Sequence, residues 1–399
     1  MTELPPSAPR SGWFSLTSST LTAVVVGFAS TILVVMEAAR SVGATPAEQA
    51  SWAAALCLGM AVSSFILSYR YKMPMITAWS TPGAVLIATS GGGISYQNAL
   101  GAFVVAGLLM MVVGLIKPLE KAIEKIPGPI AAAMLGGVLL RYTLGVPGAA
   151  VAMPWAVLPL IVVFFGLRLS YPLYAVPVVV VAGVALAGFT GGFAGNCCNF
   201  GTTALVWTTP AFDLQTILSI GVPLFLVTMA SQNLPGFAVL RASGYQPPVQ
   251  PALLVTGATS MLMAPFGSHA INMAAITASI VTGPDCHPDP NKRWLVAWPY
   301  LVLYGLIGLM AAGFVQVLGA LPKDLITAIA GLALFSPLLG SVIAMMKEPK
   351  DIESALVTFL VTASGLTLGG VGSAFWGLVA GLALFGARHL LARMRRRGG

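Results

Sequence analysis

Apolar segments recur along the whole chain, and this feature constrains its fold more than any other. A helix needs roughly 20 apolar residues to cross the hydrocarbon core of a bilayer. Several of the segments are shorter, yet they follow one another with only brief polar interruptions. We therefore predict an all-α membrane protein with fourteen transmembrane segments, at residues 17–36, 52–69, 74–90, 98–116, 127–145, 153–169, 173–190, 216–236, 250–263, 265–282, 294–318, 323–346, 353–368 and 371–391.

The composition indicates that lipid surrounds most of the chain. Of 399 residues, 57% are hydrophobic and only 8% are charged, against about 25% charged in an ordinary soluble domain. The net charge of +8 would suit a nucleic-acid-binding protein, but the basic residues lie in short loops and in a tail at 393–397. That pattern is typical of cytoplasmic anchoring beside a membrane. We expect the lipid bilayer as a partner and no nucleic acid.

The distribution of positive charge predicts the orientation in the membrane. With the N-terminus inside, seventeen of the twenty lysine and arginine residues fall on the cytoplasmic side, and the exceptions are Arg40, Arg141 and Lys323. One miscounted span would scramble the sides downstream, so this bias supports the topology. We expect a multi-pass protein of a bacterial-type inner (plasma) membrane with cytoplasmic N- and C-termini. Its first span is expected to be retained and not cleaved as a signal peptide.

The two halves of the chain are similar to each other. An offset of 195 residues gives six identical residues between 127–145 and 322–340. An offset of 201 residues matches 227–250 with identical residues in 26–49 that include Val26, Ala29, Ser30, Arg40, Gly43, Pro46 and Gln49. Chance similarity between apolar, glycine-rich segments is the alternative explanation. Because seven spans in each half is an odd number, a duplicated second half must lie upside down in the membrane. The sequence thus predicts a 7+7 inverted repeat, a plan found in secondary transporters.

The third and tenth segments are interrupted at matching places. In the third, Pro82 suits the first position of a helix and Thr81 suits the N-cap. We therefore expect an extended stretch at 74–80 and a half-helix at 82–90. In the tenth, an offset of 191 brings Asn272 to the place of Thr81. We expect Asn272 to cap a second half-helix, again after an extended stretch.

Two such breaks at one depth predict a binding site. Extended backbone is tolerated within a membrane only where protein buries it or where it lines a cavity. Half-helices that begin there direct N–H groups and the positive ends of their dipoles towards the cavity. This arrangement favours an anion or a carbonyl-rich neutral ligand. The alternative is two proline-kinked helices with no ligand between them.

The eighth segment carries three polar residues in succession, Ser231, Gln232 and Asn233. Amides within an apolar span are costly unless they find partners, so they face either a site or another helix. Neighbours on a helix point about 100° apart, so Gln232 and Asn233 are not expected to touch one ligand together. The matching residues of the first segment are Ser30 and Thr31, for which helix packing is nearly as good an explanation.

Of the three histidines, His389 lies at the start of the basic tail and His287 in a loop, so His269 is the one expected deep within the membrane. An ionisable residue at this depth usually has a function, and histidine exchanges a proton near neutral pH. A neutral imidazole that only makes hydrogen bonds is the alternative. All twelve acidic residues lie in loops, in the leader or at span ends, and Glu37 is the nearest of them to the site. Trp79 and Phe266 flank the extended stretches and are candidates to enclose an aromatic ring, with the lipid interface as the alternative.

The four cysteines show no metal-ligand spacing. Adjacent Cys197 and Cys198 do not easily bond to each other, so we expect these two, like Cys57 and Cys286, to be structural. The sequence also lacks an acid–base pair of the kind that catalysis requires. We expect no metal, no cofactor, no catalytic residue and no enzymatic activity.

Three stretches resemble the benzoate/proton symporter family (the BenE type): residues 71–84, 229–236 and 265–272. The likeness extends over essentially the whole chain, and the second and third stretches are the more specific. More remotely, the chain resembles the uracil/xanthine permeases and the sulfate-type anion transporters.

The resemblance implies a division into two domains that move against each other, with the substrate between the two half-helices. The core domain would comprise residues 1–125 (spans 1–4) and 213–320 (spans 8–11). The gate domain would comprise residues 126–212 (spans 5–7) and 321–399 (spans 12–14 and the basic cytoplasmic tail). The remote relatives often form homodimers, so a homodimer is among the expected assemblies.

The chain departs from the nucleobase permeases at the acids that hold the base. Aligning residues 275–277 puts His269 at the place of a glutamate, and Ser231 or Gln232 near the acid of their eighth span. Neutral or cationic groups at these places suit a carboxylate substrate, which two glutamates would repel.

We therefore expect import of benzoate or a similar small aromatic carboxylate with protons, by alternating access. The alternatives are a nucleobase or other organic-anion transporter, and a passive anion channel on the same fold. The carboxylate is expected against the half-helix N-termini, the ring against Trp79 or Phe266, and the coupled proton on His269. The expected substrate-binding residues are Thr77, Trp79, Ser80, Thr81, Gly83, Ser231, Gln232, Asn233, Phe266, Ser268, His269 and Asn272.

Overall fold

The structure is a computed structural model that describes residues 12–116, 127–172, 174–189, 201–369 and 371–397. Helices dominate it, as the apolar composition requires. Within lipid, a helix satisfies its backbone N–H and C=O groups inside one segment, whereas an open strand does not.

The first half of the chain begins with long helices. The second of them starts at a capping box: the Glu48 N–H donates to the Thr45 hydroxyl at 3.3 Å, and the Thr45 N–H donates to the Glu48 carboxylate at 2.8 Å. The helices of this half are α1 (Gly12–Ser41), α2 (Pro46–Tyr71), α3 (Thr81–Ser90), α4 (Tyr96–Leu115), α6 (Gly128–Thr143), α7 (Gly145–Ala152), α8 (Pro154–Ser170) and α9 (Ala175–Phe189).

The second half is more broken. Its expected first span, 216–236, is a helix interrupted by two π-helical turns, η1 and η2. π-helical turns occur frequently at functional sites. The helical elements of this half are α10 (Leu214–Thr216), η1 (Ile217–Gly221), α11 (Val222–Thr228), η2 (Met229–Asn233), α12 (Leu234–Ala242), α13 (Val249–Met263), η3 (Ala264–Phe266), α14 (Ile276–Val281), η4 (Pro290–Val296), α15 (Ala297–Leu309), α16 (Ala311–Gly319), α17 (Lys323–Ala333), α18 (Phe335–Met345), η5 (Pro349–Asp351), α19 (Ile352–Ala363) and α20 (Ser373–Arg397).

Fewer helices are long and apolar enough to cross a membrane than the fourteen segments that the sequence predicts. In the described ranges, seven helices are long and apolar enough to cross a membrane, or nine if each of two bent pairs counts as one span. Helices α8 and α9 are apolar but shorter. The structure is thus a mostly helical membrane protein, and the count of fourteen stays a prediction.

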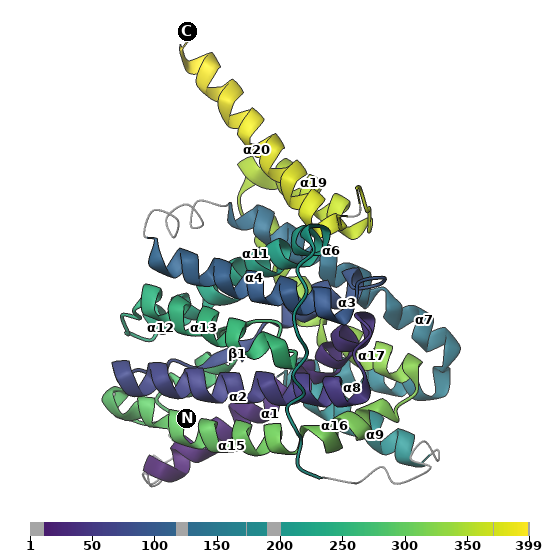
Figure 1. Cartoon of the computed structure of the whole chain (residues 1–399), viewed down its shortest axis with the longest axis vertical. Helices are drawn as coiled ribbons and strands as arrows, with labels where there is room; N and C mark the ends of the chain where they lie inside the picture. Colours follow the sequence, from purple (N-terminus) through teal and green to yellow (C-terminus); the bar gives the residue numbers. More distant parts are fainter. Residues whose placement is uncertain (1–11, 117–126, 173, 190–200, 370, 398–399) are drawn as a thin grey trace, which may run out of the picture.

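The expected segment 294–318 is not one straight helix. Helices α15 and α16 meet there at a bend of 56°. Thr203, from a segment that crosses these helices (Figure 1), occupies the bend: its N–H donates to the Leu309 carbonyl at 2.8 Å, and its hydroxyl accepts from the Ala312 N–H at 2.8 Å. The inserted threonine therefore satisfies backbone groups that the bend removes from the helical ladder.

The expected segment 323–346 is also bent, by 40° between α17 and α18. Pro337 lies in the first turn of α18. A proline ring clashes with the carbonyl of the residue four positions earlier, here Ala333, the last residue of α17. The bend therefore follows from the sequence at this point.

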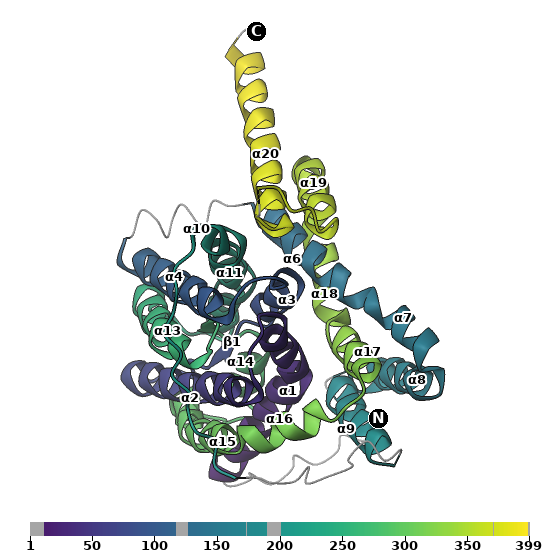
Figure 2. The same cartoon turned by 45° about the vertical axis from the view of Figure 1, so that its right-hand side comes forward.

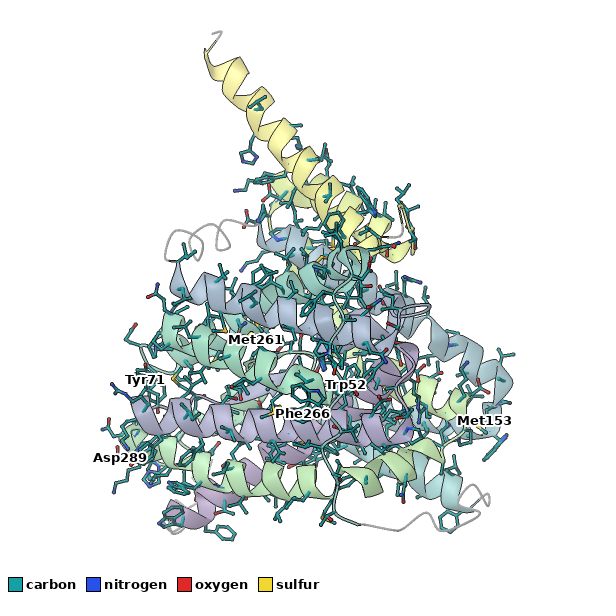
Figure 3. All side chains as sticks on the ribbon, viewed as in Figure 1. Trp52, Tyr71, Met153, Met261, Phe266 and Asp289 are labelled. Carbon is teal, nitrogen blue, oxygen red and sulfur yellow. The ribbon has the colours of Figure 1, made fainter. Side chains whose placement is uncertain are left out.

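The helices pack around a central pair of short strands. Helix α4 packs against α13 and α2 against α15, while α1 contacts α3, α14 and α15. In another set, α19 packs against α20 and α6, and α17 contacts α7, α8 and α9. Figures 1 and 2 show these sets, with α20 projecting beyond the rest. Figure 3 places Tyr71 and Asp289 at one end of the helices and Met153 at the opposite end.

The two strands bring the third and tenth apolar segments together. Strand β1 (Thr77–Trp79) pairs antiparallel with β2 (Ile271–Met273), with Thr77 opposite Met273 and Trp79 opposite Ile271. The pairing continues on both sides, because the Ser80 N–H donates to the Ala270 carbonyl at 3.1 Å and the Ala274 N–H donates to the Ile76 carbonyl at 2.9 Å.

The helix caps beside the strands differ from the expected ones. Thr81 is the first residue of α3, and Ser80 is the N-cap, whose hydroxyl accepts from the Gly83 N–H at 3.1 Å. Asn272 caps no helix, because its strand pairing keeps it extended. Helix α14 begins only at Ile276, with no side-chain cap. The two half-helices therefore begin at other residues, and with other caps, than the sequence predicted.

Close glycine packing between α4 and α13 gives a test of the fold. A Cβ atom on Gly257 would lie 2.8 Å from the Gly107 carbonyl oxygen and 2.9 Å from the Met111 backbone nitrogen. Because backbone cannot give way cheaply, we expect Gly257→Ala to cost about 1–3 kcal/mol and to lower the melting temperature of the detergent-solubilised protein by several degrees. Gly305→Ala is the control, since its Cβ would meet no heavy atom within 4 Å. Equal melting temperatures for the two variants would contradict this packing.

Candidate functional site

A cavity of about 970 Å³ lies beside the strand pair. Small-molecule sites have volumes of about 300–1,000 Å³, so it is large enough for a small ligand and its path. Its walls come from α1, α6, α9, α18 and the stretch η2–α12, and the residues around β1 and before α14 also contribute. We call it the central cavity.

The central cavity has a deep end and a mouth. At the deep end lie Trp79, Thr81 and Pro82, opposite residues 274–277. At the other end the lining reaches Lys347 and Glu348, which are exposed. The cavity is therefore open near the end of α18 and ends at the strand pair.

Trp79 forms a rigid aromatic wall of the deep end. Its indole N–H donates to the Thr31 hydroxyl at 2.8 Å, and its ring makes T-shaped contacts with Phe28 and Tyr304, with centroid distances of 5.8 and 6.5 Å. Thr31 and Tyr304 also line the cavity. A fixed indole face of this kind suits a flat aromatic ligand.

The first turn of α3 offers fewer free donors than expected. Thr81 and Pro82 line the cavity, whereas Gly83 and Ser80 are buried behind them. Pro82 has no N–H group, and the Gly83 N–H donates to the Ser80 hydroxyl. An anion here would therefore meet mainly the Thr81 residue and the helix dipole.

The π-helical turn η2 separates its polar residues. Ser231 and Gln232 line the central cavity, whereas Asn233 is fully buried outside its lining. The Asn233 side-chain oxygen accepts from the Met273 N–H at 2.8 Å, and its nitrogen lies 3.3 Å from the Met229 sulfur. Asn233 thus fastens η2 to β2, and Gln232 is the amide available to a ligand.

His269 lies behind the strand pair, fully buried and outside the cavity lining. The Trp52 indole N–H donates to His269 Nδ1 at 3.1 Å, and His269 Nε2 lies 2.9 Å from the Ser80 carbonyl oxygen. Indole is only a donor and a carbonyl only an acceptor, so the proton must be on Nε2. The imidazole is therefore neutral, with both nitrogens bonded, in this conformation.

The remaining expected residues also lie outside the cavity lining. The Thr77 hydroxyl bonds to the Ser63 and Ser64 hydroxyls, both at 2.8 Å. Phe266 packs against Trp207 at 5.4 Å. Ser268 and Asn272 are fully buried. In the orientation that satisfies its amide, Asn272 accepts from the Ser80 N–H at 3.0 Å.

Thr277 is a candidate that sequence reasoning missed. It lines the central cavity, is only 6% exposed, and its hydroxyl has no hydrogen-bond partner among the described residues. A buried hydroxyl without a partner carries a desolvation cost of about 1–3 kcal/mol, which a ligand that reached this buried oxygen would remove. Its position just after the break in the tenth apolar segment is the sequence feature that could have identified it.

The central cavity carries little charge. Among its lining residues the only lysine, arginine, aspartate or glutamate are Lys347 and Glu348, both at the mouth. Within the described ranges no three His, Cys, Asp or Glu side chains come together as a metal site. Cys57 and Cys286 are buried free thiols, and Cys197 and Cys198 lie outside the described residues.

The fold matches that of anion transporters. The transmembrane domain of a cyanobacterial bicarbonate transporter, BicA, superimposes with a TM-score of 0.61 at 14% identity, covering 94% of this chain and 98% of that one. Murine Slc26a9, an anion transporter in an inward-facing state, gives a TM-score of 0.62 at 13% identity, covering 98% of this chain and 70% of that one. These similarities show the fold alone.

Two curated relatives match over nearly their full length. Inner membrane protein YdcO of Escherichia coli (strain K12) is 38% identical over 94% of this chain and 96% of its own. The benzoate membrane transport protein of Acinetobacter baylyi is 31% identical over 96% of this chain and 97% of its own. The sequence profile of the benzoate membrane transport protein family matches residues 14–386. The chain therefore belongs to that family, the BenE family.

Proposed function

We propose that this multi-pass inner membrane protein is a secondary active transporter that carries benzoate, or a similar small aromatic carboxylate, together with protons by alternating access. The family and the fold support anion transport. The identity of the anion, the coupling to protons and the mechanism are the parts that we propose.

The chemistry of the central cavity is the observation that carries this proposal. Its deep end combines a fixed indole, Trp79, with the hydroxyl groups of Thr81 and Thr277 and the amide of Gln232. The Ser231 hydroxyl also lines the cavity, but it already donates to the Val227 carbonyl and can only accept from a ligand. The deep end has no carboxylate, and the one acid at the mouth, Glu348, is paired with Lys350 at 3.2 Å. An aromatic ring would pack on the indole, and a carboxylate would accept hydrogen bonds without facing a like charge.

Alternating access is supported by the way the cavity is built. One wall comes from α1, the start of α3, η2 and the residues before α14, which belong to the proposed core residues 1–125 and 213–320. The opposite wall comes from α6, α9 and α18, which belong to the proposed gate residues 126–212 and 321–399. Movement of one set against the other would close the mouth and open the deep end.

Coupling through His269 has a structural condition. A second proton would have to enter at Nδ1, where the Trp52 N–H already donates. Two donors would then face each other, so protonation requires the Trp52 contact to open. Proton uptake at His269 would therefore rearrange the connection between α2 and the residues before β2. The proton could instead enter on the substrate itself, as the undissociated acid. Glu37 is another possible proton carrier, although it lies outside the lining of the central cavity.

The neutral deep end also fits a nucleobase, which is rich in carbonyl and N–H groups. Uracil is therefore a necessary competitor in each binding test, together with sulfate as a carboxylate-free anion. Stabilisation by benzoate and salicylate, and by neither competitor, is the expected pattern in a thermal-shift assay, because only a ligand that binds the folded state raises its melting temperature.

We expect Gln232→Ala to weaken benzoate binding about tenfold, since a hydrogen bond to a charged group is worth about 1.5–3 kcal/mol and 1.4 kcal/mol is tenfold in affinity. Asn233→Ala is the matched variant. It leaves the Met273 N–H unpaired within the membrane, so it is expected to lower the melting temperature instead. Titration calorimetry and thermal unfolding measure the two effects. Unchanged affinity in Gln232→Ala would assign this amide to helix packing.

Thr277→Val removes the unpaired hydroxyl and keeps the shape of the side chain. We expect about tenfold weaker benzoate binding with no loss of thermal stability, because the hydroxyl has no protein partner to lose. Thr256→Val is the control: that hydroxyl donates to the Ala252 carbonyl at 2.9 Å, away from the cavity lining. If Thr277→Val bound benzoate as well as the wild type, Thr277 would not contact the ligand.

The role of His269 is tested by uptake into proteoliposomes under an imposed proton gradient. The wild type is expected to accumulate benzoate above its external concentration, which a passive channel does not do. His269→Gln is expected to retain some binding, through the groups of the central cavity, but to lose proton-driven accumulation and the pH dependence of affinity between pH 5.5 and 8. His287→Gln, in a loop, is the control. A His269→Gln variant that keeps accumulation and the wild-type pH profile would leave His269 as a neutral hydrogen-bonding residue.

A further inference from the structure

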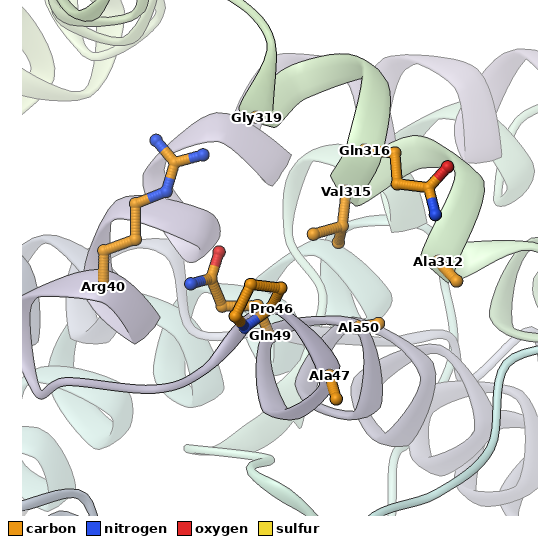
Figure 4. A pocket seen from close by; sticks show the side chains of 9 residues that line it. All are labelled: Arg40, Pro46, Ala47, Gln49, Ala50, Ala312, Val315, Gln316 and Gly319. Carbon is orange, nitrogen blue, oxygen red and sulfur yellow. The ribbon is translucent and has the colours of Figure 1, made fainter. Parts of the chain in front are cut away.

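The chain has a second pocket, of about 500 Å³ (Figure 4). It is formed where α1 ends, where α2 begins and along α16. None of its lining residues lines the central cavity. We call it the Arg40 pocket, and its lining residues are Arg40, Pro46, Ala47, Gln49, Ala50, Ala312, Val315, Gln316 and Gly319.

The Arg40 pocket and the mouth of the central cavity lie towards opposite ends of the helices. On α1, the central cavity touches Thr31, and Arg40 is nine residues further on, about 13 Å along the helix axis. The bent pair α17–α18 runs from Lys323, four residues after Gly319 of the Arg40 pocket, to Met345, beside the mouth of the central cavity. The Arg40 pocket is thus on the face that the central cavity does not reach.

The ion pair of Arg40 is weak enough to leave its guanidinium available to an anion. Among the described residues its ion-pair partner is Glu37, one turn earlier in α1, at 4.0 Å, and both side chains are about a third exposed. A pair this long and this solvated is weak. Arginine has five N–H donors in a planar fork that matches the geometry of a carboxylate.

The rest of the pocket suits a small organic body more than an inorganic ion. Gln49 is buried, and its amide is fixed because its nitrogen donates to the Ala44 carbonyl at 2.8 Å. Gln316, Ala312 and Val315 line the pocket from α16, and Ala50 lines it from α2 (Figure 4). The combination is one guanidinium, two amides and an apolar surface.

We propose that the Arg40 pocket binds the carboxylate substrate at the face opposite the mouth of the central cavity, as a capture site that precedes entry from that side. This inference rests on the proposed function for the identity of its ligand. The guanidinium of Arg40 would hold the carboxylate, and the apolar side chains would contact the ring.

The test is protection of a cysteine in the pocket from a membrane-impermeant maleimide. Ala47 is exposed and lines the pocket, so Ala47→Cys, in the full chain with its four native cysteines replaced by alanine, reports occupancy. Millimolar benzoate is expected to slow labelling several-fold, and benzamide, its neutral analogue, is expected to have little effect. Adding Arg40→Gln is expected to abolish the protection. Lys323→Gln, which removes a positive charge from an exposed residue outside the pocket, is expected to keep it.

A second variant tests the pocket without changing its charge. A Cβ on Gly319 would lie 3.6 Å from an Arg40 guanidinium nitrogen, an ordinary contact, so Gly319→Ala is expected to be tolerated. Gly319→Leu extends into the pocket and is expected to remove protection. In proteoliposomes, Arg40→Gln and Gly319→Leu are each expected to raise the KM for uptake from the pocket's side about tenfold at unchanged maximal rate.

The two proposals fail in different ways. Uptake of benzoate with no protection of Ala47→Cys, or with protection that Arg40→Gln leaves intact, would overturn the capture site and leave the transporter standing. Equal protection by benzamide would also overturn it, because carboxylate recognition would be absent. Absence of benzoate uptake by the wild type, with protection still lost in Arg40→Gln, would overturn the proposed function and leave an anion site at Arg40.

Discussion

The pairing of β1 with β2 is the interaction on which the rest of the structure depends. Extended backbone at membrane depth leaves its N–H and C=O groups without partners, at several kcal/mol each. The two strands satisfy part of this need for each other. Side chains supply the remainder: the Ser64 hydroxyl accepts from the Thr77 N–H, the Tyr300 hydroxyl donates to the Thr77 carbonyl, and the Ser260 hydroxyl accepts from the Ile271 N–H. Helices α2, α13 and α15 are thereby tied to the strands that end at the cavity.

This requirement explains why so many polar residues of the chain are not available to a ligand. Thr77, Asn233, His269 and Asn272 all look like site residues in a sequence, because polar groups are rare in apolar spans. In the structure each bonds to strand backbone or to the serines and carbonyls around it. What remains for a ligand is a smaller set on the cavity side of the strands, and Thr277 belongs to it.

The sequence could therefore predict the region of the site better than its individual contacts. Pro82 indicates where a helix begins after an extended stretch, and the run at 231–233 indicates polar groups near it. Neither shows that Ser80 takes the N-cap or that a π-helical turn directs Gln232 into the cavity and Asn233 away from it. These outcomes depend on strand register and on contacts such as Asn233 with Met273, which join residues 40 positions apart. The bend between α15 and α16 is a further case, since Thr203, which fills it, is more than 100 residues away from Ala312 in the sequence.

The arrangement around His269 constrains how a proton could enter the transport cycle. Its neutral form joins α2, through Trp52, to the Ser80 carbonyl at the end of β1. A proton on Nδ1 breaks the first of these contacts and strengthens the second, because a charged donor makes the stronger bond to a carbonyl. The Ser80 hydroxyl in turn caps α3, whose first residues line the central cavity. A carboxylate bound at Thr81 and a proton bound at His269 would thus act on the same turn from its two sides. If the carboxylate raises the affinity for the proton, linkage requires that the proton raises the affinity for the carboxylate by the same factor.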